Sequence, residues 1–167
     1  MVYPVTSDKD MDDILYSSPI GQMIISANNQ GLTGINYVKP EDDRAAQLSE
    51  GTTNPHIEQA RAELDLYFNR RLEAFTTKLA AEGTPFQLKV WTALSQIPFG
   101  VTVSYAHIAE QIGSPMAYQA VGMANHRNPI SIIIPCHRII GRDGKLIGYG
   151  GGIWRKEWLL RHEGSIL

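Results

Sequence analysis

The stretch Ile130-Ser131-Ile132-Ile133-Ile134-Pro135-Cys136-His137-Arg138 is the part of the sequence from which the rest is best understood. Its first five residues are mostly apolar and β-branched, which predicts an extended segment through a core. The segment then changes abruptly to proline, cysteine, histidine and arginine. An apolar core does not favour such polar groups, so the sequence predicts that this strand delivers a functional group at its end.

Cys136 is the only cysteine in the chain, so an internal disulfide or a cysteine-rich zinc site is excluded. A free cysteine beside isoleucines is usually a small buried hydrophobe. A reactive cysteine needs a base or positive charge nearby, and His137 and Arg138 follow directly. This favours a nucleophile. Neighbours in an extended segment point to opposite faces, so His137 need not touch the sulfur directly. If the segment bends into a turn, we expect contact through one water. The other histidines are scattered without metal-ligand spacing, and we expect no metal or cofactor.

Upstream, the pattern is helical. Thr84-Pro85-Phe86-Gln87 has the form of a capping box with proline in the first turn. Ser104 should cap a short helix that Gly113 ends, and Pro115 should open a second one that runs to about Asn125. Two short helices joined through a glycine predict a helix-turn-helix, which by itself is weak evidence for DNA binding.

The first half of the chain has a different organisation. Three β-like runs at 14–17, 22–27 and 32–38, separated by turn-forming residues, predict an antiparallel meander. The polar segment Lys39–Thr53 is expected to be a loop. A helix should begin at Asn54, with Pro55 in its first turn. No reactive cluster appears in residues 1–83, which we interpret as a scaffold.

The two halves differ in charge. Residues 1–83 hold 7 Lys+Arg and 13 Asp+Glu, a sum of −6, whereas residues 84–167 hold 8 and 4, a sum of +4. A polyanion would be drawn to the second half, although a chance split remains open. No apolar stretch is long enough for a membrane span, and the acidic N-terminus does not have the layout of a signal peptide. A reducing, cytoplasmic location and no membrane contact are expected.

Downstream of Cys136, the residues 141–144 should form a turn and the glycine-rich 148–152 a loop, before a last helix at 154–162. At 132–140, together with Gly151-Gly152 and the segment 156–164, the sequence resembles the O6-alkylguanine-DNA alkyltransferases. The likeness runs from about Thr84 to Gly164 and includes Trp91, Ser104-Tyr105, 120–122 and Asn128-Pro129. The N-terminal half is similar only in its strand-then-helix layout.

The resemblance implies an α+β fold. Residues 1–80 would form a ribonuclease-H-like domain with a three-stranded antiparallel sheet and a helix, and residues 81–167 a winged-helix-like helical domain with a helix-turn-helix. It implies that O6-alkylguanine in double-stranded DNA, and O4-alkylthymine, is flipped out and gives its alkyl group irreversibly to Cys136. A monomer is expected.

The resemblance also implies roles for individual residues. His137, through a water, and Glu163 would draw off the thiol proton, Tyr105 would donate to guanine N3, and Asn128 would brace the turn. The base pocket would be formed by Ile139, Tyr149, Gly150 and Gly151, with the Gly150 N–H bonded to O6. The expected DNA contacts are Tyr105, Ala106, Ser114, Ala117, Tyr118, Gln119, Gly122 and Arg142.

The sequence departs from the family on the predicted recognition helix. Gln119 stands where an arginine usually inserts into the base stack, and Tyr118 stands where a small residue is common. Glutamine lacks the planar cation, so we expect repair of duplex DNA to be slower than in a Gln119→Arg variant. The alternatives are a lesion sensor with weak or no transfer, a transcription regulator and a thiol hydrolase. The small residues of 117–124 argue against the regulator, and no oxyanion site supports the hydrolase.

Overall fold

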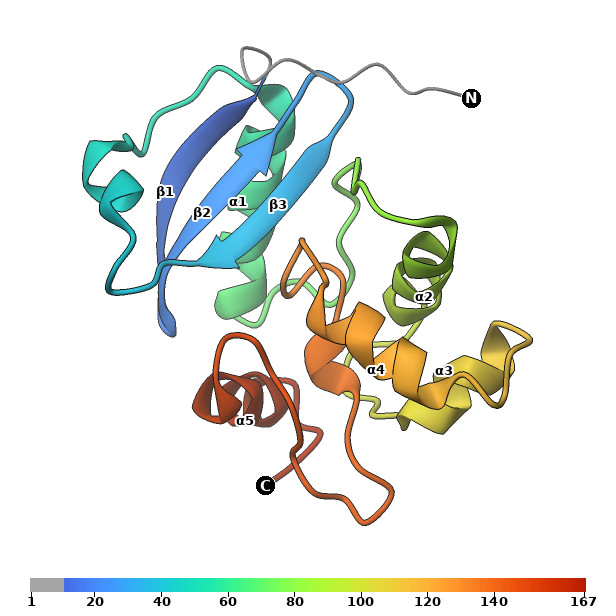
Figure 1. Ribbon diagram of the computed structural model, residues 1–167. Coiled ribbons are helices and arrows are strands. Elements are labelled where there is room, and N and C mark those ends of the chain that lie inside the picture. The colour runs from blue at the N-terminus through green and yellow to red at the C-terminus, as the bar shows by residue number, and fades with distance from the viewer. Residues whose placement is uncertain (1–10) are drawn as a thin grey trace. The chain divides into compact units, whose positions relative to one another are not determined.

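A computed structural model of the chain describes residues 11–167 (Figure 1). The chain divides between Ala81 and Glu82 into two compact units, each with its own core. Within the described range, no helix is long and apolar enough to cross a membrane.

The N-terminal unit is built on the predicted meander. Strands β1 (Asp12–Ser18), β2 (Gly21–Ala27) and β3 (Leu32–Tyr37) pair antiparallel in the order β1-β2-β3 (Figure 1). The side chain of Asn28 closes the second turn, because its Oδ1 accepts from the backbone N–H groups of Gln30 and Gly31. The prediction of three antiparallel strands is therefore confirmed.

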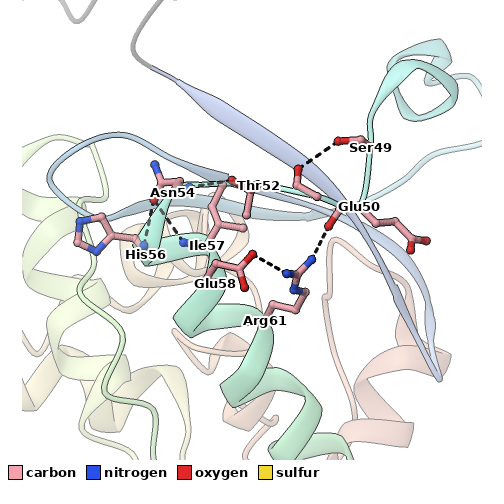
Figure 2. Close-up of polar contacts among 9 residues, drawn as sticks. Ser49, Glu50, Thr52, Asn54, His56, Ile57, Glu58 and Arg61 are labelled. Carbon is pink, nitrogen blue, oxygen red and sulfur yellow. Dashed lines mark hydrogen bonds and ion pairs between the residues drawn. The ribbon is translucent and has the colours of Figure 1, made fainter.

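Helix α1 (Pro55–Phe68) packs against this sheet and begins where the sequence predicts. Figure 2 shows Asn54 at its start, where Oδ1 accepts from the N–H groups of His56 and Ile57. The inward side of α1 carries Ile57, Ala60, Leu64 and Tyr67, all fully buried. The preceding segment is not all loop, since a short 3-10 helix, η2 (Asp43–Gln47), interrupts it.

The C-terminal unit is helical. Helix α2 (Pro85–Ser95) begins with the predicted capping box, in which Thr84 and Gln87 each bond the other's backbone N–H. The indole N–H of Trp91 donates to the carbonyl of Ala124, 2.9 Å away, and so ties α2 to α4 (Tyr118–His126). Helix α3 (Tyr105–Gln111) is capped by Ser104, and α5 (Ile153–His162) closes the chain.

Helices α3 and α4 form the expected helix-turn-helix. Gly113, at φ +76°, ends α3, and the Ser114 N–H bonds the Ala109 carbonyl in a Schellman motif. The prediction that α4 begins at Pro115 is wrong, because α4 begins at Tyr118. Pro115 instead occupies the second position of a β-turn that the Ala117 N–H closes onto the Ser114 carbonyl, a position for which its fixed φ is suited.

The predicted extended segment at 130–134 is also wrong. These residues form a compact turn in which the Ile134 N–H bonds the Ile130 carbonyl at 3.0 Å. Ile132 lies at φ +73°, in the left-handed region that β-branched residues avoid. The isoleucines are buried as expected. Burial alone produced the apolar pattern, which does not distinguish a strand from a buried turn.

Candidate active site around Cys136

Cys136 begins a single turn of 3-10 helix, η3 (Cys136–Arg138), and is only 5% exposed. Burial raises the pKa of its thiol, because a low-dielectric surrounding disfavours the thiolate. The Asn128 side chain, the charge of Lys156 and nearby backbone N–H groups act in the opposite direction without reversing the shift. At neutral pH the sulfur is therefore a thiol, and its reaction as a nucleophile requires a base.

His137, the next residue in the chain, is the candidate for that base. It is fully buried, and burial lowers its pKa, so its imidazole is neutral at pH 7. Its Nε2 lies 2.8 Å from Oε1 of Glu163. A carboxylate only accepts, so Nε2 carries the hydrogen and Nδ1 is a bare acceptor. Nδ1 has no hydrogen-bond partner among the residues that the structure describes.

Glu163 is ionised in this interior. Burial raises its pKa, but hydrogen bonds from His137 and Arg138 outweigh that and hold the pKa far below its usual range. Arg138 forms a two-pronged pair with Glu163, with Nε–Oε2 and Nη2–Oε1 both at 2.9 Å, and its Nη1 donates to the Ile97 carbonyl. Arg138, which the sequence places beside the thiol, is thus paired with Glu163 instead.

The cation that acts on Cys136 is Lys156, which sequence reasoning missed. Its side chain is fully buried, and its Nζ donates to the carbonyls of Ile147 and Gly148 at 2.7 and 3.4 Å. Burial lowers its pKa to about 8. The sequence carries a signal for this position in its helical spacing. Lys156 precedes Leu159, Leu160 and Glu163 by three, four and seven residues, and so falls on the inward face of α5.

Asn128 spans the turn that precedes Cys136. Its Nδ2 donates to the carbonyl of Ile134 at 2.7 Å, and its Oδ1 accepts from the N–H of Ile130 at 2.9 Å. These two bonds connect the two ends of the turn, and the same side chain interacts with the thiol of Cys136. The amide therefore both shapes the backbone and contacts the reactive group.

Tyr105, the first residue of α3, belongs to the same site. A parallel β-bridge between Val103 and Ile139 brings the start of α3 next to the segment after Cys136. A Cβ added at Gly148 would lie 3.6 Å from the Tyr105 hydroxyl oxygen. Burial raises the pKa of the phenol, a hydrogen bond from Asn125 lowers it, and a negative charge on Cys136, where the thiolate forms, raises it further. Asn125 is a second residue that sequence reasoning missed.

The loop predicted to wall the site leaves open space beside Gly150. Tyr149 is half-buried, Gly151 accepts from Arg155 Nη1 at 2.8 Å, and a Cβ at Gly150 would meet nothing within 4 Å.

Of the predicted DNA contacts, the exposed ones are Tyr118, Gln119 and Arg142, and the partly exposed ones are Tyr105, Ala106, Ser114, Ala117 and Gly122. In residues 11–167, no group of three or more His, Cys, Asp or Glu is arranged to hold a metal ion.

Both units of the chain match models of known protein domains. Residues 13–81 match the family described as "6-O-methylguanine DNA methyltransferase, ribonuclease-like domain", and residues 85–165 match its "DNA binding domain". The methylated-DNA–protein-cysteine methyltransferase of Methanosarcina acetivorans is 45% identical, covering 90% of this chain and 97% of its own. That of Mycobacterium leprae is 49% identical, over 87% and 88%.

Solved structures agree. The O6-methylguanine methyltransferase of Mycobacterium tuberculosis superimposes with a TM-score of 0.82 at 42% identity, covering 93% of both chains. The same protein has been solved in complex with DNA, and that structure matches 92% of each chain with a TM-score of 0.81. With both sequence halves matched and the α+β fold shared, this chain belongs to the O6-methylguanine DNA methyltransferase family.

Proposed function

We propose that this chain repairs DNA by direct reversal, with Cys136 as the acceptor that takes an alkyl group from O6-alkylguanine and keeps it. The observation that carries the proposal is that neutral His137, which follows Cys136 directly in the chain, bonds ionised Glu163 through Nε2 and leaves Nδ1 as a buried acceptor without a partner in the described part of the chain. A protonated thiol becomes a nucleophile when a neutral imidazole with a free acceptor nitrogen takes its proton.

The chemistry balances without a cofactor. His137 Nδ1 takes the thiol proton through one water, and the sulfur attacks the alkyl carbon in line with the C–O6 bond. A C–S bond forms as the C–O6 bond breaks, and its electron pair passes to the guanine ring. Tyr105 gives its proton to N3, and the proton on His137 restores the phenol. The product is a thioether, which offers no easy leaving group, so each molecule acts once.

The remaining site residues would hold the base. The Gly150 N–H would bond O6, the carbonyls of Cys136 and Ile139 would read the exocyclic amine, and Tyr149 would wall the pocket with Gly151. Asn128 would keep the turn in shape through the two bonds described above. O4-alkylthymine presents an alkyl oxygen in a similar place and would be a second substrate.

DNA is the partner of this family's C-terminal domain. We assign DNA contact to α3 and α4 through Tyr105, Ala106, Ser114, Ala117, Tyr118, Gln119 and Gly122, with Arg142 on the neighbouring turn. Residues 1–80 would serve as the scaffold domain and 81–167 as the domain for DNA binding and transfer, in a monomer. Because the lone thiol must stay reduced to react, a reducing, cytoplasmic location fits this role.

Intact mass of the protein after incubation with duplex DNA that carries O6-methylguanine tests the proposal. We expect one added methyl, mapped to Cys136 and absent in Cys136→Ala. The same experiment with unmodified DNA is the control. A protein that binds the lesion tightly and stays unmodified would instead be the lesion sensor, and the proposal would be wrong.

A further inference from the structure

Asn125 is a buried amide that the chemistry above does not use. It lies in α4, is 5% exposed, and its Oδ1 has no hydrogen-bond partner within residues 11–167. An unpaired buried acceptor is destabilising, because the hydrogen bonds that it made to water in the unfolded chain are not replaced. Leucine would fill a similar volume without this cost, so the presence of an amide here needs a reason.

The reason lies in what the other end of the amide contacts. Gly122 and Asn125 are three residues apart and share one face of α4. The ring of Tyr105 crosses this face, since a Cβ at Gly122 would lie 3.8 Å from it, and the Asn125 side chain hydrogen-bonds the phenol. On its other side the hydroxyl is close to Gly148. The hydroxyl is therefore held between α4 and the loop that follows Cys136.

The direction of this hydrogen bond follows from the two ends of the amide. Because Oδ1 of Asn125 has no partner in the described residues, the end that meets the phenol oxygen is the amide nitrogen, whose N–H only donates. The acceptor of the same side chain, Oδ1, receives no bond from Tyr105. The phenol hydrogen is consequently not used by Asn125 and remains available to another acceptor.

We infer that Asn125 is a positioning residue that holds Tyr105 as a hydrogen-bond donor toward N3 of the flipped base. This inference rests on the proposed function. As the C–O6 bond breaks, Tyr105 passes its proton to N3, and the Asn125 N–H supports the negative charge that develops on the phenol oxygen. A carboxylate at this place would do the reverse, since it would accept the phenol hydrogen itself.

Single-turnover methyl transfer from duplex DNA tests the inference in a double-mutant cycle. Asn125→Leu should slow transfer by about tenfold, the worth of one hydrogen bond to a developing charge. Asn125→Asp, which keeps the size, should slow it further. In a Tyr105→Phe background neither substitution should change the rate more than about twofold, because the group on which Asn125 acts is gone.

Two readouts separate positioning from a structural role. The affinity for lesion DNA and the reaction of Cys136 with a small disulfide reagent should be unchanged in Asn125→Leu and Asn125→Asp. Met123→Leu, exposed on the same helix, is the matched control and should react as the unsubstituted chain. If Asn125→Leu does not fold, Asn125→Asp carries the test. Equal slowing with and without the Tyr105 hydroxyl, or no slowing, would overturn the inference while Cys136 is still methylated. Absence of methylation in the unsubstituted chain would instead overturn the proposed function, and the inference with it.

Discussion

Lys156 holds a cation in the interior of the C-terminal unit, where its Nζ is bonded to backbone carbonyls and acts on the thiol of Cys136. Removal of a charge from water is unfavourable, and the lowered pKa of about 8 is the measure of that cost. The charge also opposes the effect of burial on Cys136. Stability and nucleophile activation thus make opposite demands on this one side chain.

The first prediction concerns the pH dependence of stability. An unfolded lysine titrates near 10.4, so between about pH 8 and pH 10 the unfolded chain binds more protons than the folded one. The contribution of Lys156 to the free energy of unfolding therefore rises with pH over this range, by about 2 kcal/mol between pH 7.5 and 9.5. Lys156→Met should lose this rise. Urea unfolding, followed by fluorescence of Trp91, Trp154 and Trp158 in this unit, measures it. A Cys136→Ser background removes the thiol titration, and an unchanged slope in Lys156→Met would contradict the prediction.

Ile132 gives a second prediction at this scale. It is 1% exposed at φ +73°, whereas Ile134, 2% exposed, has no positive φ. Glycine at either position loses a similar apolar burial, but only at 132 does it relieve backbone strain, of about 1–2 kcal/mol. Ile132→Gly should therefore destabilise the chain by at least about 1 kcal/mol less than Ile134→Gly in urea unfolding. Equal losses would mean that the left-handed residue is not strained.

For the helices and turns, local chemistry accounts for what could be predicted from the sequence. The caps at Thr84 and Ser104 and the glycine at 113 act within one turn of chain, so their residues suffice to mark helix ends. The turn at 130–134 could not be predicted, because the bonds of Asn128 that close it depend on tertiary position. For the same reason Lys156 was missed, although its helical spacing was visible.

Helix α4 carries the third prediction. Gln119 is exposed near its start, and an arginine there would supply a planar cation to occupy the gap left by a flipped base. Gln119→Arg should speed methyl transfer from duplex DNA and leave the reaction with the free base O6-benzylguanine unchanged, since the free base needs no flipping. Met123→Arg adds the same charge elsewhere on the exposed side of α4 and should not reproduce the gain. If both variants transfer the methyl group equally faster, the added positive charge and not the position of the arginine would be the cause.

Across the two units, the difference in formal charge overstates the positive charge that is available to DNA. Residues 84–167 carry a formal +4, but Arg138 and Lys156 are buried in the site. Arg161 and Lys145 form ion pairs with Glu157 and Asp143, and Arg155, which is half-buried, donates to the Gly151 carbonyl. The exposed cations of this unit without an ion pair in the described structure are Lys89, Arg127 and Arg142. DNA binding should therefore depend on few phosphate contacts.

The salt dependence of binding measures this number. Each neutralised phosphate contributes about −0.9 to the slope of log K against log salt concentration, so three or fewer contacts predict a slope no steeper than about −3. Arg142→Gln should make the slope shallower by about 1, because one phosphate fewer is neutralised and one counterion fewer is released. Arg71→Gln changes an exposed cation of the acidic N-terminal unit and should leave the slope unchanged. A slope far steeper than −3, or an equal effect of both substitutions, would mean that cations of the N-terminal unit contact DNA as well. The division of the chain into a scaffold domain and a DNA-binding domain would then be wrong.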